Sequence, residues 1–230
     1  MPTGVARRPG AGRPSRERLT RDRIVETALA LVDDEGLDAL SLRGVATALG
    51  VSPMALYRYF TTRDDLADAV VIELIEREQA TTDLPDNWSD ALTQIARETR
   101  AILFRHPVVL EAIQRRPVLT PSALERFDRM IGLMVDTGAT PAEAVAAYAT
   151  VLAYVVGFVS LEFGRQQSLA TAGRTEEEMR ARVAKQVAEL PLDKFPHLVG
   201  VADDVASLVG AARFEAGLAT VLRGLGGVKH

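Results

Sequence analysis

The chain has 230 residues and a formal net charge of −4, with 47% hydrophobic and 25% charged residues. These values are typical of a soluble protein with one large or two small domains and enough apolar residues for a core. The absence of cysteine excludes disulfides and thiolate-bound metals. No apolar run approaches the roughly 20 residues that span a bilayer, the longest candidate being 151–163, and the basic N-terminus lacks the apolar segment of a secretory signal. We therefore expect a cytoplasmic protein with no membrane partner.

The charge is distributed unevenly along the chain. Residues 1–23 carry seven arginines against Glu17 and Asp22, which gives a net charge of +5. Residues 24–63 carry a net charge of −2, and the remainder carries −7. A basic end on an acidic body indicates a protein that presents that end to nucleic acid. Residues 1–18 are rich in Arg, Gly and Pro and are expected to be disordered, either as a solvated tail or as an arm along DNA phosphates.

Residues 41–60 carry the most informative pattern, two short helices around a tight turn. The apolar residues of the first helix fall on one face, and Gly50 can adopt the left-handed conformation that ends a helix. Ser52 followed by Pro53 is a typical start for the next helix. This is the helix-turn-helix pattern, in which the second helix enters the major groove of DNA. The pattern predicts a DNA-binding protein.

Helices are expected on both sides of this motif. One spans 20–35, and a longer one spans 62–79, where Thr62 and Asp65 resemble a capping box. The polar stretch 81–87 indicates a boundary between domains.

The rest of the chain is also expected to be helical. Thr140-Pro-Ala-Glu143 is a strong helix start, with an N-cap, a proline at the first position and a glutamate at the third. Residues 164–173 are expected to form a loop, and no stretch shows strand alternation. The expected helices span 88–104, 107–116, 120–137, 140–163, 176–190 and 203–225, with 191–201 irregular.

These elements predict an all-α protein with three parts. The first is the disordered basic arm, residues 1–18. The second is a helix-turn-helix domain, residues 19–66, formed by three helices. The third, residues 67–230, is reached through the long helix and is expected to bind an effector and to dimerise.

The segment from residue 19 to 75 resembles the N-terminal domain of tetracycline-repressor (TetR) family transcription regulators. The resemblance rests on Leu49-Gly50-Val51-Ser52, on Leu56-Tyr57-Arg58-Tyr59-Phe60 and on the helix start Arg63-Asp64-Asp65-Leu66. The C-terminal part is similar to the regulatory domain of the tetracycline repressor, through Phe104-Arg105-His106-Pro107 and Arg213-Phe214-Glu215-Ala216-Gly217-Leu218.

The resemblance implies a repressor that leaves a palindromic double-stranded DNA operator when a small-molecule effector binds. It also implies a homodimer, in which helices near 141–163 and 203–225 pair with their mates in a four-helix bundle. Both segments are more apolar than the core of one protomer requires, which agrees with that implication.

By the resemblance, DNA is contacted from the recognition helix and from residues around it. Arg43 is placed to reach a base edge or a phosphate, and Tyr57 and Tyr59 are placed to donate hydroxyls to phosphates. The alternatives are a solvated surface charge for Arg43 and a half-buried packing role for Tyr59. The expected DNA contacts are Arg43, Ser52, Pro53, Met54, Ala55, Tyr57, Arg58, Tyr59 and Arg63.

The resemblance also implies an effector pocket between helices of the C-terminal domain. Methionine and aromatic side chains suit an adaptable apolar pocket, and they equally suit an ordinary core. Glu162 and Arg165, at the end of the long apolar helix, could address a polar group of a ligand, but an exposed ion pair is the expectation. The candidate lining residues are Ile102, Phe104, Ile113, Met130, Met134, Tyr148, Leu152 and Phe158.

No metal or cofactor is expected. Tetracycline repressors hold a drug–magnesium chelate through a histidine in the helix before the segment that resembles Arg116-Pro117. Ala112 occupies that position here, and His106 is expected to lie at a helix end.

Two other classes of function remain as alternatives. One is a DNA-binding regulator that needs no ligand. The other is an enzyme that binds a small molecule. With three histidines, no cysteine and no Gly-x-Ser-x-Gly or His-Glu-x-x-His pattern, the chain offers few catalytic constellations, so no enzymatic activity is expected.

Overall fold

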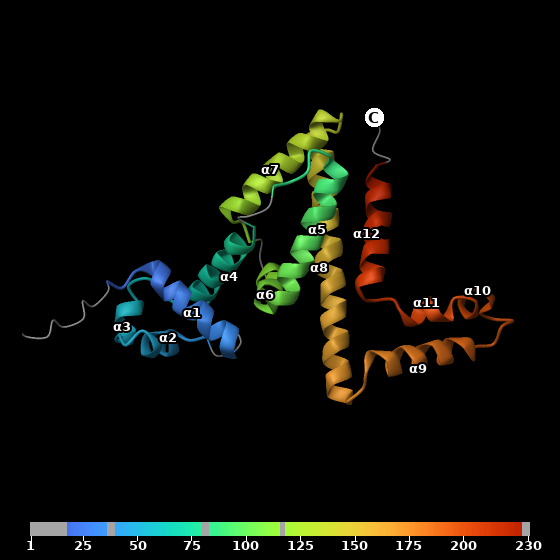
Figure 1. Cartoon of the computed structure of the whole chain (residues 1–230), viewed down its shortest axis with the longest axis horizontal. Helices are drawn as coiled ribbons and strands as arrows, with labels where there is room; N and C mark the ends of the chain where they lie inside the picture. The colour runs from blue at the N-terminus through green and yellow to red at the C-terminus, as the bar shows by residue number, and fades with distance from the viewer. Residues whose placement is uncertain (1–17, 36–39, 80–82, 116–117, 227–230) are drawn as a thin grey trace, which may run out of the picture. The chain divides into compact units, whose positions relative to one another are not determined.

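The computed structural model describes residues 18–35, 40–79, 83–115 and 118–226. Within these ranges the chain forms helices and no strands, which confirms the predicted all-α class (Figure 1). The chain divides into two compact units, one up to Val70 and one from Val71, so the division lies within α4 (Arg63–Gln79). The predicted basic arm, apart from Arg18, lies outside the described residues.

The first unit contains α1 (Arg21–Glu35), α2 (Leu42–Ala48), α3 (Pro53–Leu56) and the first turns of α4. Its core is apolar, and burial of each large side chain contributes about 1.5–3 kcal/mol. The predicted helix-turn-helix is present, although α3 is a single turn. The largest fully or nearly fully buried side chains are Ile24, Leu40, Val45, Leu56, Phe60 and Leu66.

Local signals fix the ends of these helices. Gly50 adopts φ 64, so it makes the left-handed turn that the sequence predicts. Ser41 caps α2, because its Oγ accepts the amide of Gly44 at 3.0 Å. Ser52 occupies the N-cap position of α3 but makes no side-chain cap, contrary to its predicted capping role. Thr62 and Asp65 exchange hydrogen bonds at 3.0 Å in both directions, which confirms the predicted capping box.

The second unit is built around α8 (Pro141–Ala172). This helix packs against α5 (Trp88–Arg105), α7 (Pro121–Asp136) and α12 (Ala211–Leu225), and α6 (Pro107–Arg115) packs on α5. The predicted capping box at the start of α8 is confirmed, with Thr140 and Glu143 as the partners. The core of the unit includes Leu92, Leu103, Met130, Val155, Phe214 and Leu218.

The long helix α8 corrects two expectations. It continues through Gly164 to Ala172, where a loop was predicted, because one glycine costs a helix only about 1 kcal/mol and the turn comes at Gly173, with φ 59. The expectation that no apolar run approaches roughly 20 residues is also corrected. An 18-residue window of this helix reaches a mean hydropathy of 2.0, which makes α8 long and apolar enough to cross a membrane by length and composition alone.

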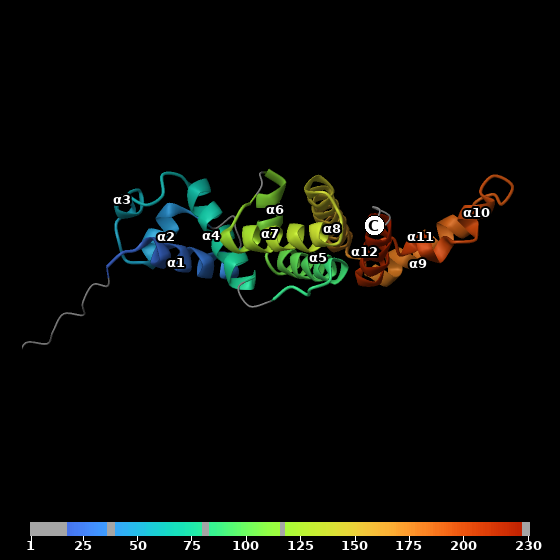
Figure 2. The same cartoon turned by 90° about the horizontal axis from the view of Figure 1, so that it is seen from above.

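A side arm, defined here as residues 175–207, follows α8. It contains α9 (Glu176–Ala188), α10 (Pro196–Val199) and α11 (Ala202–Ala206), which pack mainly on one another. Figures 1 and 2 both show the side arm extending away from α8 and α12. The single helix predicted over 203–225 is wrong: Gly210 has φ 117, and the chain there separates α11 from α12.

Candidate DNA-binding and effector sites

The residues expected to face DNA lie on the exposed side of α3 and the turn after it. The side chain of Met54 is 74% exposed, which is unusual for a large apolar residue in a folded domain. Ser52, Pro53, Tyr57, Arg58 and Tyr59 are also exposed, whereas Ala55 is half-buried. The opposite side of the motif is the core, through Leu56 and Phe60. The structure therefore brings most of the predicted contacts to one side of one short segment.

Two exposed arginines in and near this segment have no partner among the described residues. Arg43 is exposed at the second position of α2, and Arg58 is exposed just after α3. Among the described residues, neither side chain makes a hydrogen bond or an ion pair. A guanidinium without a protein partner keeps all five of its donors for phosphate or a base edge.

Two of the predicted contacts already have protein partners. The Tyr59 hydroxyl donates to the carbonyl of Leu19 at 2.7 Å, and the residue remains 42% exposed. Arg63 donates from Nε to the carbonyl of Leu40 at 2.8 Å. Both bonds fix neighbouring segments of the first unit. The structure thus gives Tyr59 and Arg63 a positioning role. A packing role was the alternative for Tyr59, but the sequence could not name the partners, which are backbone atoms 40 and 23 residues away.

The pocket candidates in the second unit form part of its core. Met130 and Met134 are 0% and 3% exposed, and Tyr148 packs on Phe127 with ring centroids 4.3 Å apart. Burial raises the pKa of the Tyr148 hydroxyl above its ordinary value of 10.0. The nearby charge of Arg126 opposes this effect but is the smaller of the two. Ile102 and Phe158 are buried, and Phe104, Ile113 and Leu152 are half-buried.

A buried ion pair, missed by sequence analysis, joins α5 to α8. Arg100 donates to Glu162 through two nitrogens, with Nη2 2.8 Å from Oε1 and Nε 3.1 Å from Oε2. The guanidinium carbon also lies 4.7 Å from the ring centroid of Phe104 and 5.0 Å from that of Phe214. The predicted exposed pair of Glu162 with Arg165 is therefore wrong. The two partners are 62 residues apart, so no local pattern could have indicated them.

Two adjoining cavities lie where the side arm meets α8 and α12. One has a volume of about 360 Å³ and the other about 330 Å³, and Arg180, Val209 and Gly210 line both. None of the eight predicted pocket residues lines either cavity. Volumes of this size are at the lower end of the range that small-molecule sites occupy.

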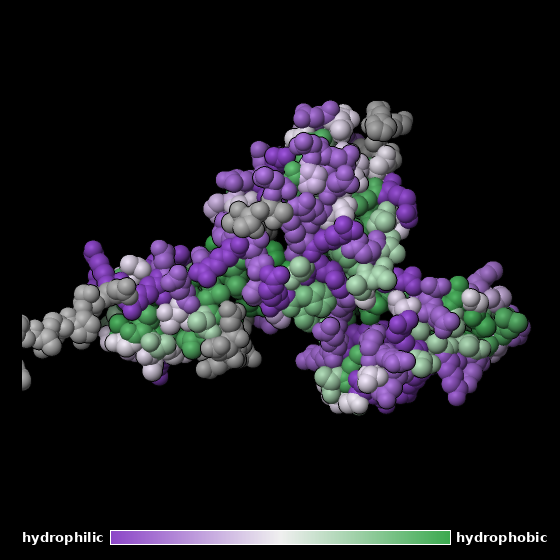
Figure 3. All heavy atoms as spheres, viewed as in Figure 1, coloured by the Kyte–Doolittle hydropathy of each residue, from purple (hydrophilic) through white to green (hydrophobic). Residues whose placement is uncertain are grey.

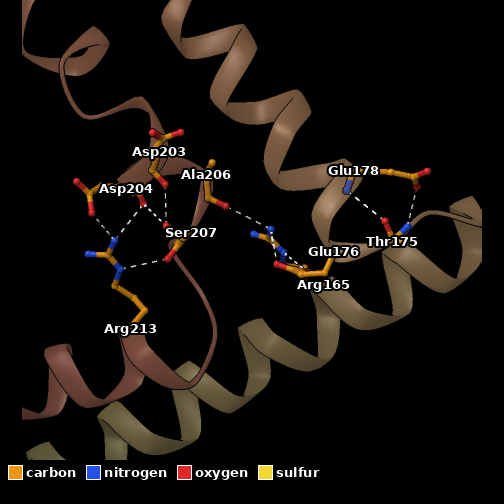
Figure 4. Close-up of polar contacts among 9 residues, drawn as sticks. All are labelled: Arg165, Thr175, Glu176, Glu178, Asp203, Asp204, Ala206, Ser207 and Arg213. Carbon is orange, nitrogen blue, oxygen red and sulfur yellow. Dashed lines mark hydrogen bonds and ion pairs between the residues drawn. The ribbon is translucent and has the colours of Figure 1, made fainter.

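Arginine side chains hold the base of the side arm in place (Figure 4). Arg165 on α8 forms an ion pair with Glu176 at 2.7 Å and donates to the carbonyl of Ala206. Arg213 on α12 donates to the carbonyl of Ser207 at 3.1 Å and to the carboxylate of Asp204 at 3.0 Å. The carbonyls at the end of α11 are thus bonded from two different helices.

His106 lies at the end of α5, as predicted, where its backbone amide donates to Ile102. Its Nε2 is 3.5 Å from a carboxylate oxygen of Glu78 and makes no hydrogen bond. Glu78 is also paired with Arg105, and the hydrogen bond from that arginine holds the Glu78 pKa below its ordinary value of 4.5. In the part of the chain that the structure describes, no group of three or more His, Cys, Asp or Glu side chains could hold a metal ion.

Exposed small and apolar residues form stripes on α8 and α12. Figure 3 shows apolar residues gathered along α12 and on the side arm. On α8 the exposed residues recur every fourth position, and on α12 three alanines share the exposed side. The α8 stripe consists of Val145, Ala149, Ala153, Gly157 and Leu161, and the α12 stripe of Ala212, Ala216 and Ala219.

Known proteins match the two units separately. Residues 24–70 match the family described as "Bacterial regulatory proteins, tetR family". Residues 81–228 match the family described as "Tetracyclin repressor-like, C-terminal domain". Together the two matches cover most of the chain, and residues 71–80, which include the rest of α4, lie between them.

Relatives extend the match over nearly the whole chain. The HTH-type transcriptional repressor DrrR1 of Streptomyces coeruleorubidus is 35% identical over 223 residues, 96% of this chain and 82% of that protein. The class A tetracycline repressor of transposon 1721 from Escherichia coli is 29% identical, over 90% of this chain and 91% of its own length.

Solved structures give the same result. ActR of Streptomyces coelicolor, a TetR family protein solved in complex with actinorhodin, aligns with a TM-score of 0.76 and 29% identity. The alignment covers 91% of this chain and 96% of ActR. The chain belongs to the TetR family of bacterial transcription regulators and is a DNA-binding protein with the all-α fold of that family.

Proposed function

We propose that this protein is a homodimeric repressor that binds a palindromic operator and is released by a small-molecule effector. The observation that carries the proposal is the exposed side of the segment from Ser52 to Tyr59, where Arg58 and the nearby Arg43 have guanidinium groups without a partner among the described residues. Phosphate contacts position such a protein and base contacts give it specificity. The segment itself offers few donors to bases, so Arg43, apolar contacts from Met54 and DNA shape supply the specificity.

The two stripes of exposed small residues support the homodimer. Small side chains let helix backbones approach closely, and a dimer with two-fold symmetry would place α8 and α12 against their mates. A dimer also explains why α8 is apolar on faces that its own protomer leaves exposed. We therefore assign the apolar surface of α8 to a protein contact in the cytoplasm rather than to a membrane.

The unit from Val71 to Leu225 is the proposed effector domain. The ActR complex with actinorhodin supports this role, because that relative is ligand-bound and shares the fold over most of the chain. An effector can release DNA only if it binds better to a conformation that fits the operator poorly. The helix α4 is the element that both units share, so it is the proposed lever.

Selection of binding sites from a random pool of duplex DNA tests the repressor proposal. We expect enrichment of a palindromic sequence that binds two protomers of the full chain. Failure to enrich any sequence, or binding of a single protomer, would refute the proposal.

The dimer has a separate test in sedimentation. Ala153→Glu places a charge on the α8 stripe and should shift the protein to monomer. The control is Ala101→Glu, which places the same charge at an exposed position on α5 and should leave the protein dimeric. Equal effects of the two variants would argue against this interface.

A screen of small molecules for release of the selected operator distinguishes an effector-released repressor from a ligand-independent regulator.

A further inference from the structure

The two cavities at the base of the side arm share Arg180, a cation that has no partner among the residues that the structure describes. The charged residues that line them are Glu162, Arg165, Glu176, Arg180 and Arg213. Among the described residues, Arg180 is the only one of the five whose side chain makes no hydrogen bond or ion pair. Arg180 lines both cavities, so among the described residues it is the one charge there that a ligand can neutralise.

The other four charges are already balanced inside the protein. Glu162 is paired with Arg100, at 2.8 Å, and only 8% of its side chain is exposed. Arg165 is paired with Glu176, and Arg213 with Asp204. A cationic ligand would have to take a carboxylate from one of these pairs, whereas an anionic ligand would gain an ion pair with Arg180 at no such cost.

The remaining lining is apolar or small. Leu169 lines the larger cavity, and Val209 lines both. The smaller cavity adds Ala211, Ala212 and Ala216 from the first turns of α12. Apolar walls with one placed charge are typical of sites that hold a carboxylate on an apolar frame, and a fully hydrated inorganic anion gains little from such walls.

We propose that these cavities form an effector site for a compact organic anion, with Arg180 as its counter-ion. This inference rests on the proposed function, because it names the class of effector and the place where it binds. The ligand would contact α8, α9 and the segment before α12 together, so its binding would tighten the side arm against the body of the unit. The site also borders Ala212 and Ala216 of the α12 stripe, which connects ligand binding to the geometry of the dimer.

The test is a calorimetric titration of the full-length protein with 2-naphthoate, 2-naphthamide and inorganic phosphate. The first two probes share a shape and differ in charge, and phosphate has charge without an apolar frame. We expect saturable binding of one 2-naphthoate per protomer and no saturable binding of the other two. Equal binding of 2-naphthamide, saturable binding of phosphate alone, or no binding of 2-naphthoate would overturn the proposal.

Variants on one helix locate the site. Arg180→Ala should weaken 2-naphthoate binding about tenfold to a hundredfold, the usual effect of losing a charged hydrogen bond. Arg182→Ala removes an exposed arginine two residues away that lines neither cavity, and it should bind as the unmodified protein does. Gln166→Tyr fills part of the larger cavity without touching its ion pairs and should also weaken binding. Equal affinity of the Arg180→Ala and Arg182→Ala proteins would refute the site.

Operator binding separates this proposal from the repressor proposal. In the absence of a ligand, Arg180→Ala should bind the selected operator as tightly as the unmodified protein. If the unmodified protein binds no operator, the repressor proposal fails whatever the titration gives. If it binds its operator but not 2-naphthoate, only the anion site fails.

Discussion

Tyr154 and Gly217 pack in direct contact, and their contact holds α8 against α12. The Tyr154 hydroxyl donates to the carbonyl of Phe214 at 2.7 Å. A Cβ atom added to Gly217 would overlap that hydroxyl oxygen and would lie 2.9 Å from Cζ of the ring. A side chain at position 217 would therefore force the Tyr154 ring or one of the two helices to shift. The rings of Tyr154 and Phe214 are also stacked, with centroids 5.5 Å apart.

The first prediction follows from this contact. Gly217→Ala should lower the free energy of unfolding by about 1–3 kcal/mol, the usual cost of overpacking a core. Gly132→Ala is the matched control, because it lies within α7 with nothing within 4 Å of the added methyl group, and it should be neutral or gain up to about 1 kcal/mol. Urea unfolding at a fixed protomer concentration measures both. A Gly217→Ala protein as stable as the Gly132→Ala protein would contradict this packing of α8 on α12.

The second prediction concerns the buried ion pair. Glu162→Gln leaves the charge of Arg100 between two aromatic rings without its counter-ion, which should cost about 3 kcal/mol of stability. The control is Glu73→Gln, which removes the ion pair of Glu73 with Arg77, whose side chain is 50% exposed. Loss of this exposed pair should change stability by less than about 0.5 kcal/mol. Similar unfolding midpoints for the two variants would show that the buried pair adds nothing to stability.

The third prediction is that the unfolding temperature depends on pH in the acid range. Hydrogen bonds from Arg97 hold the pKa of Glu215 below its ordinary value of 4.5, and Arg105 lowers the pKa of Glu78 in the same way. A lowered carboxyl pKa adds stability above pH 4.5, and that stability is lost as the pH falls through the lowered value. The unfolding temperature should therefore fall below pH 4.5, and less steeply in Glu215→Gln. The same slope in that variant and in the unmodified protein would exclude a contribution from Glu215.

Much of the local structure could be predicted from the sequence, because short-range patterns determine it. The capping boxes at Thr62 and Thr140 and the left-handed turn at Gly50 depend on residues within a few positions of one another. The predicted end of α8 was wrong, because no such short-range signal marks it. Gly164 carries no stop signal beyond its own weak propensity, so α8 continues past it to Gly173.

The contacts between helices could not be predicted in the same way. The pairing of Arg100 with Glu162 and the bond from Tyr59 to Leu19 join residues that are distant in sequence. The cavities that Arg180 lines depend on the packing of α11 on α9 and on the break between α11 and α12. The single helix predicted over 203–225 has no such break. The predicted DNA contacts and the eight pocket residues stay predictions, and measurements of operator affinity can test the first set.

The fourth prediction concerns the N-terminal arm, whose structure lies outside the described residues. Deletion of residues 1–17 should weaken operator binding and reduce its salt dependence, by about 0.9 in the log–log slope for each phosphate that the arm neutralises. A full-length protein with glutamine at Arg7, Arg8, Arg13 and Arg16 should behave like the deletion if charge is the cause. An unchanged slope in the deleted protein would show that the arm is a solvated tail.

Operator affinity of the Arg43→Ala protein tests the central claim most directly, because that claim assigns DNA reading to the exposed face of the helix-turn-helix. Fluorescence anisotropy with the selected palindrome is the measurement, and Arg182→Ala is the control. An arginine that contacts a base contributes about 1–3 kcal/mol, so Arg43→Ala should bind about tenfold to a hundredfold more weakly. The Arg182→Ala protein should bind as the unmodified protein does. Full affinity of the Arg43→Ala protein for the palindrome would contradict the account.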